Sequence, residues 1–383
     1  MTRAHLAMLA AENKKLEQAG LFRPETIHAD HIVDFTSQDY LGFAKDERIV
    51  DAARAALAKF GLSAGGSRVF SGTRSVHKEL EHTLSRFLQL PDALLFGSGY
   101  LANIGLYEAL FDSRDCLFCD ALVHPSSAEG VRLSSATTFP FRNHDIDDLE
   151  DKLRRSRSAR FRAVVTDGVY PFDGRVAELS GICALAEKYD AMVIVDDSLG
   201  VGVLGETGRG TREARNVISR VDVVTGTFSK ALGGAAGGFV AGKREVIEWL
   251  RQKATPYLFS VALPPPLAAA TTKSLELLES GAAPLARLRS QTALVKQGLE
   301  LKGWKVLGGE HPTLAVFVGE VVPLQKLVNS LYERGIHVNG LCYPVVPEGQ
   351  ARVRLEVTAA HSEEDLGRAI NAFELAGRAL RIV

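Results

Sequence analysis

A lysine within a run of hydroxyl and glycine residues is the most chemically suggestive feature of this sequence. Lys230 ends the stretch 225–230, Thr-Gly-Thr-Phe-Ser-Lys, and a glycine-rich run follows at 233–238. A lysine at the carboxyl end of a parallel strand points into the crevice where open α/β sheets bind ligands, and its amine can form an imine with an aldehyde. The hydroxyl groups of Thr227 and Ser229 could hold an anion beside it. A surface lysine next to a flexible loop would have a similar sequence, so this motif alone does not decide.

An acidic pair ends another apolar run. Residues 192–197 have the sequence Met-Val-Ile-Val-Asp-Asp, so a buried strand would bring the carboxylate of Asp196 to the same sheet edge. A protonated pyridine nitrogen needs such a partner, and a hydrogen bond to a charged group contributes about 1.5–3 kcal/mol. That proton makes the ring an electron sink. An aspartate after a strand can also bind a metal or cap a helix.

Two more polar groups follow predicted strands. Ser98, Gly99 and Tyr100 open a helix, and free backbone N–H groups at a helix start can bind phosphate. His124 comes shortly after a strand, where its imidazole could stack on a flat ring, although a hydrogen-bonded loop histidine fits equally. Phosphate cradle, histidine, aspartate and lysine thus occur in order, each after a strand. This constellation predicts a pyridoxal 5′-phosphate site.

The elements that must position these groups alternate along the chain. Apolar runs predict strands, and amphipathic stretches such as 79–88 and 180–189 predict helices between most of them, so we expect a largely parallel sheet covered on both faces. Beyond 264–266, a long helical stretch at 267–299 precedes a smaller α+β region. The predicted strands are 93–96, 117–120, 163–166, 192–196, 223–226, 239–241, 304–307, 313–318 and 353–357, and the last helices are 323–334 and one beginning near 363.

Three parts follow from this pattern. Residues 1–44 form an N-terminal helix and arm, residues 45–282 a large cofactor-binding domain, and residues 283–383 a small C-terminal domain. We therefore expect an α/β fold whose large domain holds a mostly parallel sheet between helices.

Composition narrows the partners and the location. The 383 residues carry a net charge of −1, so no global field attracts nucleic acid or anionic lipid. We expect no integral membrane segment, and the charged first 20 residues do not resemble a signal peptide. Cys116 and Cys119 form a lone Cys-x-x-Cys without the second pair that a zinc site needs, so we expect no metal. The interpretation is a cytoplasmic protein of a reducing compartment.

From about Phe35 to its end, the chain resembles the α-oxoamine synthases, a family of fold-type I pyridoxal-phosphate enzymes. The family includes 8-amino-7-oxononanoate synthase, 2-amino-3-ketobutyrate CoA ligase, serine palmitoyltransferase and 5-aminolevulinate synthase. The matching motifs are specific for the family, though not for one member. They lie at residues 39–42, 65–68, 71–73, 77, 98–100, 167–170, 202–205, 208–210, 226–233 and 351–354.

The resemblance implies a role for each matching residue. Lys230 would form the imine with the cofactor, Asp196 would pair with the pyridinium nitrogen, and His124 would stack on the ring. The phosphate would be bound by Ser98, Gly99, Tyr100, Thr227 and Ser229, with Ser260 contributed by a second subunit of a homodimer. The amino-acid substrate would contact Arg354, Gln38 and Arg23, with the guanidinium of Arg354 on its carboxylate.

The implied reaction condenses a small amino acid with an acyl thioester, with decarboxylation, to an α-aminoketone, CoA and CO₂. Glycine, alanine and serine all remain open, as do coenzyme A and acyl-carrier protein as acyl carriers. Because Val69 stands where users of succinyl-CoA carry asparagine, a longer apolar acyl chain is expected. Two other classes remain: another fold-type I enzyme, such as an aminotransferase or decarboxylase, or a low-activity partner subunit of an active homologue.

Five positions depart from the family pattern, the first of them Ser198, which stands in place of an alanine. Leu199 replaces a histidine, and Pro171 a serine, that contact the cofactor's 3′-oxygen in the family. Gln38 and Val123 each replace an asparagine. The cofactor site is therefore expected to be intact for binding but altered around the 3′-oxygen.

Overall fold

The computed structural model describes residues 3–18, 25, 27, 29, 31–156, 159–233, 235–281 and 283–383. Its contacts divide the chain into two units, Met1–Val33 and Asp34–Val383. The first unit contains helix α1 (Arg3–Gln18), and the short strand β1 (Val33–Asp34) lies at the boundary. Arg23, which we expected to contact the substrate, lies outside the described residues.

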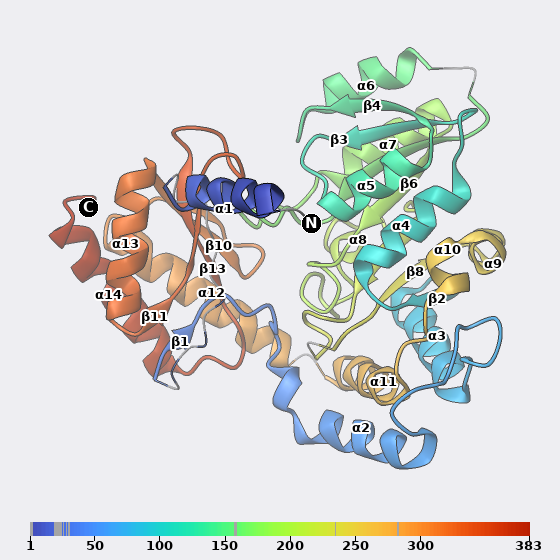
Figure 1. The fold of residues 1–383 in the computed structure, drawn as a ribbon, viewed down its shortest axis with the longest axis horizontal. Coiled ribbons are helices and arrows are strands. Elements are labelled where there is room, and N and C mark those ends of the chain that lie inside the picture. Colours follow the sequence, from blue (N-terminus) through green and yellow to red (C-terminus); the bar gives the residue numbers. More distant parts are fainter. Residues whose placement is uncertain are drawn as a thin grey trace. The chain divides into compact units, whose positions relative to one another are not determined.

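Within the unit Asp34–Val383, the strands between Asp92 and Gly242 form a seven-stranded sheet (Figure 1). Strand β8 runs antiparallel to both of its neighbours, and the other neighbouring pairs are parallel. The predicted α/β fold with a largely parallel sheet is confirmed. The order is β2 (Asp92–Phe96), β8 (Gly238–Gly242), β7 (Val223–Thr227), β6 (Met192–Asp196), β5 (Arg162–Asp167), β3 (Cys116–Asp120) and β4 (Thr137–Phe141).

The edge strand β4 was not predicted. Most of its residues are exposed or half-buried, and it contains Pro140, which lacks the N–H that an interior strand must donate. An edge strand needs neither a continuous apolar run nor strict alternation, so its sequence carries little signal.

Apolar side chains cover both faces of this sheet. Because successive side chains of a strand point to opposite faces, Val164 and Val193 join one buried cluster whereas Val165 and Ile194 join another. Helices on both sides complete the layers. They are α2 (Glu47–Phe60), α3 (Ser75–Leu88), α4 (Gly99–Leu110), α5 (Pro125–Leu133), α6 (Ile146–Arg154), α7 (Leu179–Tyr189), α8 (Thr211–Ala214), α9 (Arg244–Lys253), α10 (Thr255–Phe259) and α11 (Pro265–Ser280), preceded by the short 3₁₀ helix Phe43–Lys45.

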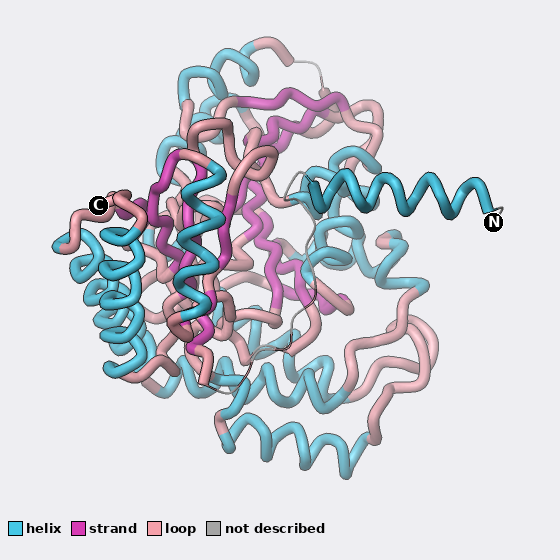
Figure 2. The backbone as a smooth tube through the Cα atoms, turned by 60° about the vertical axis from the view of Figure 1, so that its left-hand side comes forward, coloured by secondary structure: helices cyan, strands magenta, loops and turns pink. Residues whose placement is uncertain are grey.

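A four-stranded antiparallel sheet follows, and Figure 2 draws its strands in magenta, like those of the central sheet. Its order is β12 (Asn339–Leu341), β13 (Ala351–Glu356), β10 (Thr313–Gly319) and β9 (Val306–Gly308), with the short strand β11 (Ile336–His337) nearby in sequence. Helices α12 (Ala283–Leu301), α13 (Val321–Glu333) and α14 (Glu363–Ala379) accompany it. The division of the chain at residues 44 and 282 stays a prediction.

The long helical stretch expected at 267–299 is divided into α11 and α12. Gly281 ends α11, and Pro284 stands at the start of α12, the two positions where helices favour glycine and proline respectively. Continuous apolar periodicity across 267–299 therefore masked a break between two helices.

Candidate active site

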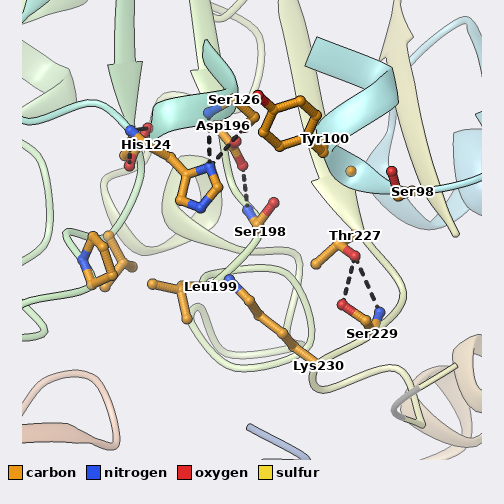
Figure 3. Close-up of a pocket in the computed structure, with 14 residues that line it drawn as sticks. Ser98, Tyr100, His124, Ser126, Asp196, Ser198, Leu199, Thr227, Ser229 and Lys230 are labelled. Atoms are coloured by element: carbon orange, nitrogen blue, oxygen red, sulfur yellow. Dashed lines mark hydrogen bonds between the residues drawn. The ribbon is translucent and has the colours of Figure 1, made fainter. Parts of the chain in front are cut away.

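A cavity of about 270 Å³ opens where the central parallel strands end (Figure 3). Every predicted catalytic residue and most predicted phosphate-binding residues line it, whereas Ser260, Gln38 and Arg354 do not. The lining residues are Ser98, Gly99, Tyr100, His124, Ser126, Asp167, Val169, Pro171, Asp196, Ser198, Leu199, Thr227, Ser229 and Lys230.

Lys230 follows the end of β7 and extends into this cavity (Figure 3). Burial lowers the pKa of its amine below the ordinary value, an effect that nearby Asp196 and Glu356 partly oppose. A lowered pKa increases the fraction of neutral amine, which is the form that attacks an aldehyde.

Asp196, the last residue of β6, is held in one orientation. The side-chain amide of Asn103 donates to its Oδ2 at 2.7 Å, and the backbone N–H of Ser198 donates to its Oδ1 at 3.0 Å. Asp167 lies beside it in the parallel β5–β6 register. Burial and the charge of Asp196 raise the pKa of Asp167 well above its usual range. Asp167 is therefore harder to ionise than an exposed carboxyl group.

His124 caps the start of α5, with its ring facing the cavity (Figure 3). Its Nδ1 accepts from the backbone N–H of Ser126 at 3.2 Å and lies 2.7 Å from the Ser126 hydroxyl. Its own backbone N–H donates to Asp167. Burial lowers the pKa of His124, so the ring is neutral with its proton on Nε2.

An anion cradle lies at the start of α4. Ser98 caps this helix by accepting from the N–H of Leu101 at 3.1 Å. The Thr227 hydroxyl donates to the Gly237 carbonyl at 3.0 Å, lies 2.8 Å from the Ser229 hydroxyl and accepts the Ser229 N–H at 3.2 Å. First-turn amides and two hydroxyl groups thus converge, as a phosphate requires.

This donor set fits pyridoxal phosphate. A buried amine, an oriented carboxylate, a neutral imidazole and an anion cradle line one cavity. They match the aldehyde, pyridine nitrogen, ring face and phosphate of that cofactor.

The side of the cavity formed by Leu199 and Pro171, two of the residues that depart from the family pattern, is apolar. Leu199 and Pro171 line the cavity, and neither side chain can donate or accept a hydrogen bond. The backbone carbonyl of Leu199 accepts from His311 Nε2 at 3.0 Å, while His311 Nδ1 accepts the N–H of Thr313 at 3.1 Å. Burial lowers the pKa of His311 to about 3, so this ring is a neutral support for the loop. Ser198 is the nearest hydroxyl along the chain on this side of the cavity.

The predicted residues outside the cavity occupy distinct places. Ser260 directly follows α10, Gln38 lies in the loop before Tyr40, and both are half-buried. Arg354 lies on β13, and its Nη1 donates at 3.2 Å to the carbonyl of Pro171, which does line the cavity.

Sequence reasoning missed two groups that organise the site, Asn103 and Ser126. Asn103 is fully buried, and its amide bridges the Ser126 hydroxyl at 2.9 Å and the Asp196 carboxylate. The available signal was an amide within the otherwise apolar helix 99–107, since such a group is rarely buried without a partner.

Comparison with known proteins agrees with this geometry. The model of the aminotransferase class I and II family matches residues 30–373. A 2-amino-3-ketobutyrate coenzyme A ligase of Salmonella typhimurium is 42% identical over 95% of each chain. A putative 8-amino-7-oxononanoate synthase of Bacillus licheniformis is 41% identical over 98% of each. The structure of S. paucimobilis serine palmitoyltransferase with bound PLP and myriocin matches with a TM-score of 0.92 and 29% identity, covering 99% of both chains.

Fold and site together define a pyridoxal-phosphate-dependent enzyme of fold type I, and the chain belongs to the aminotransferase class I and II family. Within that family it is an α-oxoamine synthase, an acyltransferase that condenses a small amino acid with an acyl thioester, with decarboxylation, to an α-aminoketone. The predicted family, cofactor and enzyme class are confirmed. Among the described residues, no helix combines the length and apolar character needed to cross a bilayer.

Proposed function

We propose that this enzyme joins glycine to the two-carbon acyl group of acetyl-coenzyme A. The observation that carries the proposal is the 42% identity, over 95% of both chains, to a 2-amino-3-ketobutyrate coenzyme A ligase. Dividing that four-carbon product between C2 and C3 leaves the two carbons of glycine and a two-carbon acyl group. As a β-keto acid, the product leaves an α-aminoketone on losing CO₂. This proposal replaces the longer acyl chain expected from Val69.

The size of the cavity supports a small amino acid. Its volume of about 270 Å³ must accommodate both the cofactor and the substrate, and ligand pockets of about 300–1,000 Å³ usually hold one drug-sized molecule. Little space would remain for a large amino-acid side chain.

Pyridoxal phosphate, when bound, supplies an electron sink for the α-carbon of the amino acid. Lys230 would hold the cofactor through its aldehyde carbon until the amine of the amino acid displaces it, and the freed Nζ would then accept the α-proton. Asp196 would keep the proton on the pyridine nitrogen, and His124 would cover the ring face. The loss of activity expected on removing Lys230 would greatly exceed that on removing His124.

Arg354 is proposed to bind the amino-acid carboxylate. Its contact with the Pro171 carbonyl brings the guanidinium to the border of the cavity, and its side chain remains 19% exposed. Nη2 has no partner among the described residues, so it is available to a substrate oxygen. A planar guanidinium is well suited to a carboxylate.

A homodimer with shared sites is also proposed. The loop 62–70 lies beside the segment 259–262 at the end of α10, since the N–H of Ala262 donates to the Gly66 carbonyl at 3.0 Å. Three large apolar side chains of these two segments, Leu62, Phe70 and Phe259, are each at least 77% exposed. Covering such side chains is favourable by about 25 cal/mol per Å², and a second copy seated here would bring Ser260 towards its partner's phosphate cradle.

The location proposed is the cytoplasm, supported by four unpaired cysteines, as a reducing compartment would maintain. Cell fractionation with an antibody against the native protein would test it, and enrichment in an organelle would contradict it.

The reaction is tested with purified enzyme, glycine, alanine or serine, and a panel of acyl-CoA thioesters from two to sixteen carbons. Product mass spectrometry, thiol release and CO₂ release are measured, with Lys230→Ala as the inactive control. We expect the highest kcat/KM with glycine and acetyl-CoA. A preference for long acyl chains would contradict the proposed acyl substrate, and no thiol release with any pair would contradict the condensation itself.

A further inference from the structure

A buried carboxylate already contacts the guanidinium proposed to bind the substrate. Arg354 and Glu356 lie two residues apart on β13, so their side chains share a face of the strand. Arg354 Nε lies 3.2 Å from Glu356 Oε1. This contact is an ion pair rather than a well-aligned hydrogen bond, since neither atom has a hydrogen-bond partner. Glu356 is fully buried.

Two hydroxyl groups keep this carboxylate in place. Thr313, opposite Glu356 in the β10–β13 register, donates to Oε2 at 2.6 Å, and the Tyr40 hydroxyl donates to the same oxygen at 3.0 Å. Tyr40 is itself fully buried with its ring edge against His311. Glu356 therefore cannot turn away to leave Arg354 free.

The charges around Glu356 are few and close. Arg354 and Lys230 are the cations that act on it, and the Thr313 and Tyr40 hydroxyls are its donors. Burial outweighs these groups and raises the pKa of Glu356 above its usual value. His311, behind Tyr40, is neutral because burial lowers its pKa to about 3. When charged, the carboxylate of Glu356 therefore repels a substrate carboxylate that binds the same guanidinium, that of Arg354.

We propose that Glu356 is an internal counter-ion of Arg354 that competes with the substrate carboxylate and so weakens the enzyme's affinity for its amino acid. The inference rests on the proposed role of Arg354. Glu356 acts through Arg354 and is therefore a positioning and affinity-setting residue. Removing its charge while keeping its shape should strengthen binding of ligands that carry a carboxylate and no others.

The test uses the cofactor-loaded enzyme and follows the change in cofactor absorbance on adding ligand. Glycine and glycinamide are compared, because both present an amine but only glycine has a carboxylate. In Glu356→Gln the amide oxygen can still accept a hydrogen bond from the two hydroxyl groups. We expect the Kd of glycine to fall roughly tenfold and that of glycinamide to stay within about twofold, since two carboxylates on one half-buried guanidinium repel each other. Tyr40→Phe removes one donor to the carboxylate and should lower the Kd of glycine by a smaller factor.

The pH dependence gives a second signature. Above the raised pKa of Glu356 the carboxylate is charged, and the ratio of wild-type to Glu356→Gln Kd for glycine should be largest. As pH falls through that pKa, Glu356 becomes neutral, and the ratio should approach one. A purely structural role would leave the ratio constant with pH.

Three results separate this inference from the function on which it rests. If Arg354→Ala does not weaken glycine binding, Arg354 does not bind the carboxylate and both proposals fail. If Arg354→Ala weakens it but Glu356→Gln leaves the Kd of glycine unchanged or raises it, only the counter-ion role fails. Equal changes for glycine and glycinamide in Glu356→Gln would also overturn that role, because the effect would not depend on the ligand's carboxylate.

Discussion

Replacing Gly99 with alanine should weaken cofactor binding, because the anion cradle has no room for a methyl group there. A Cβ at position 99 would lie 3.0 Å from the Cβ of Thr227 and 3.3 Å from the carbonyl oxygen of Gly226. Both distances are shorter than comfortable van der Waals contacts between such atoms. Thr227 would have to move by a few tenths of an ångström, together with the hydroxyl that contacts Ser229.

The size of the effect follows from the cost of overpacking a well-filled site. One inserted methyl group usually costs about 1–3 kcal/mol. If most of this cost falls on the cradle, the Kd for pyridoxal phosphate should rise about 5- to 150-fold. Gly97 provides a matched control, since among the described residues a Cβ there would meet only the Leu101 Cδ1, at an ordinary 3.6 Å.

Cofactor-free enzyme titrated with pyridoxal phosphate, followed by absorbance, measures this change directly. The melting temperature of each cofactor-free variant distinguishes a damaged cradle from a damaged fold. We expect Gly99→Ala to lose affinity while Gly97→Ala binds like the wild type. Equal affinities in the two variants would refute the cradle geometry, as would a loss of affinity fully accounted for by unfolding.

Further predictions concern the same site. Borohydride treatment should fix the cofactor to one peptide that contains Lys230, and labelling of another lysine would refute its role. Leu199→His places a hydrogen-bonding group on the apolar side of the cavity. The pH at which the cofactor absorbance changes should then shift by an amount corresponding to about 1 kcal/mol, the contribution of one hydrogen bond. Identical spectra at every pH would show that position 199 does not govern the 3′-oxygen. Mixing inactive Lys230→Ala and Ser260→Asp chains should restore activity in hybrid dimers, whereas a fully active monomer would rule out shared sites.

The sequence was sufficient to predict that the catalytic groups that follow strands share one site. Apolar runs such as 192–196 are local signals of buried strands, and parallel strands share the edge at which they end. For this reason Lys230, Asp196 and His124 could be assigned to one site, and the structure brings them to one cavity. The same local signals failed at β4, whose exposed edge needs no apolar pattern, and at the boundary between α11 and α12.

Only the tertiary structure decided which polar side chains contact the buried charged groups. Tyr40 and Glu356 are 316 positions apart, yet one hydrogen bond joins them. Strand alternation places the side chains of Arg354 and Glu356 on one face of β13. It does not reveal that hydroxyl groups from β10 and from the loop containing Tyr40 donate to Glu356. Asn103 likewise reaches Asp196 across 93 positions. A buried polar group must find its partners wherever packing brings them, so its environment depends on contacts that no local pattern encodes.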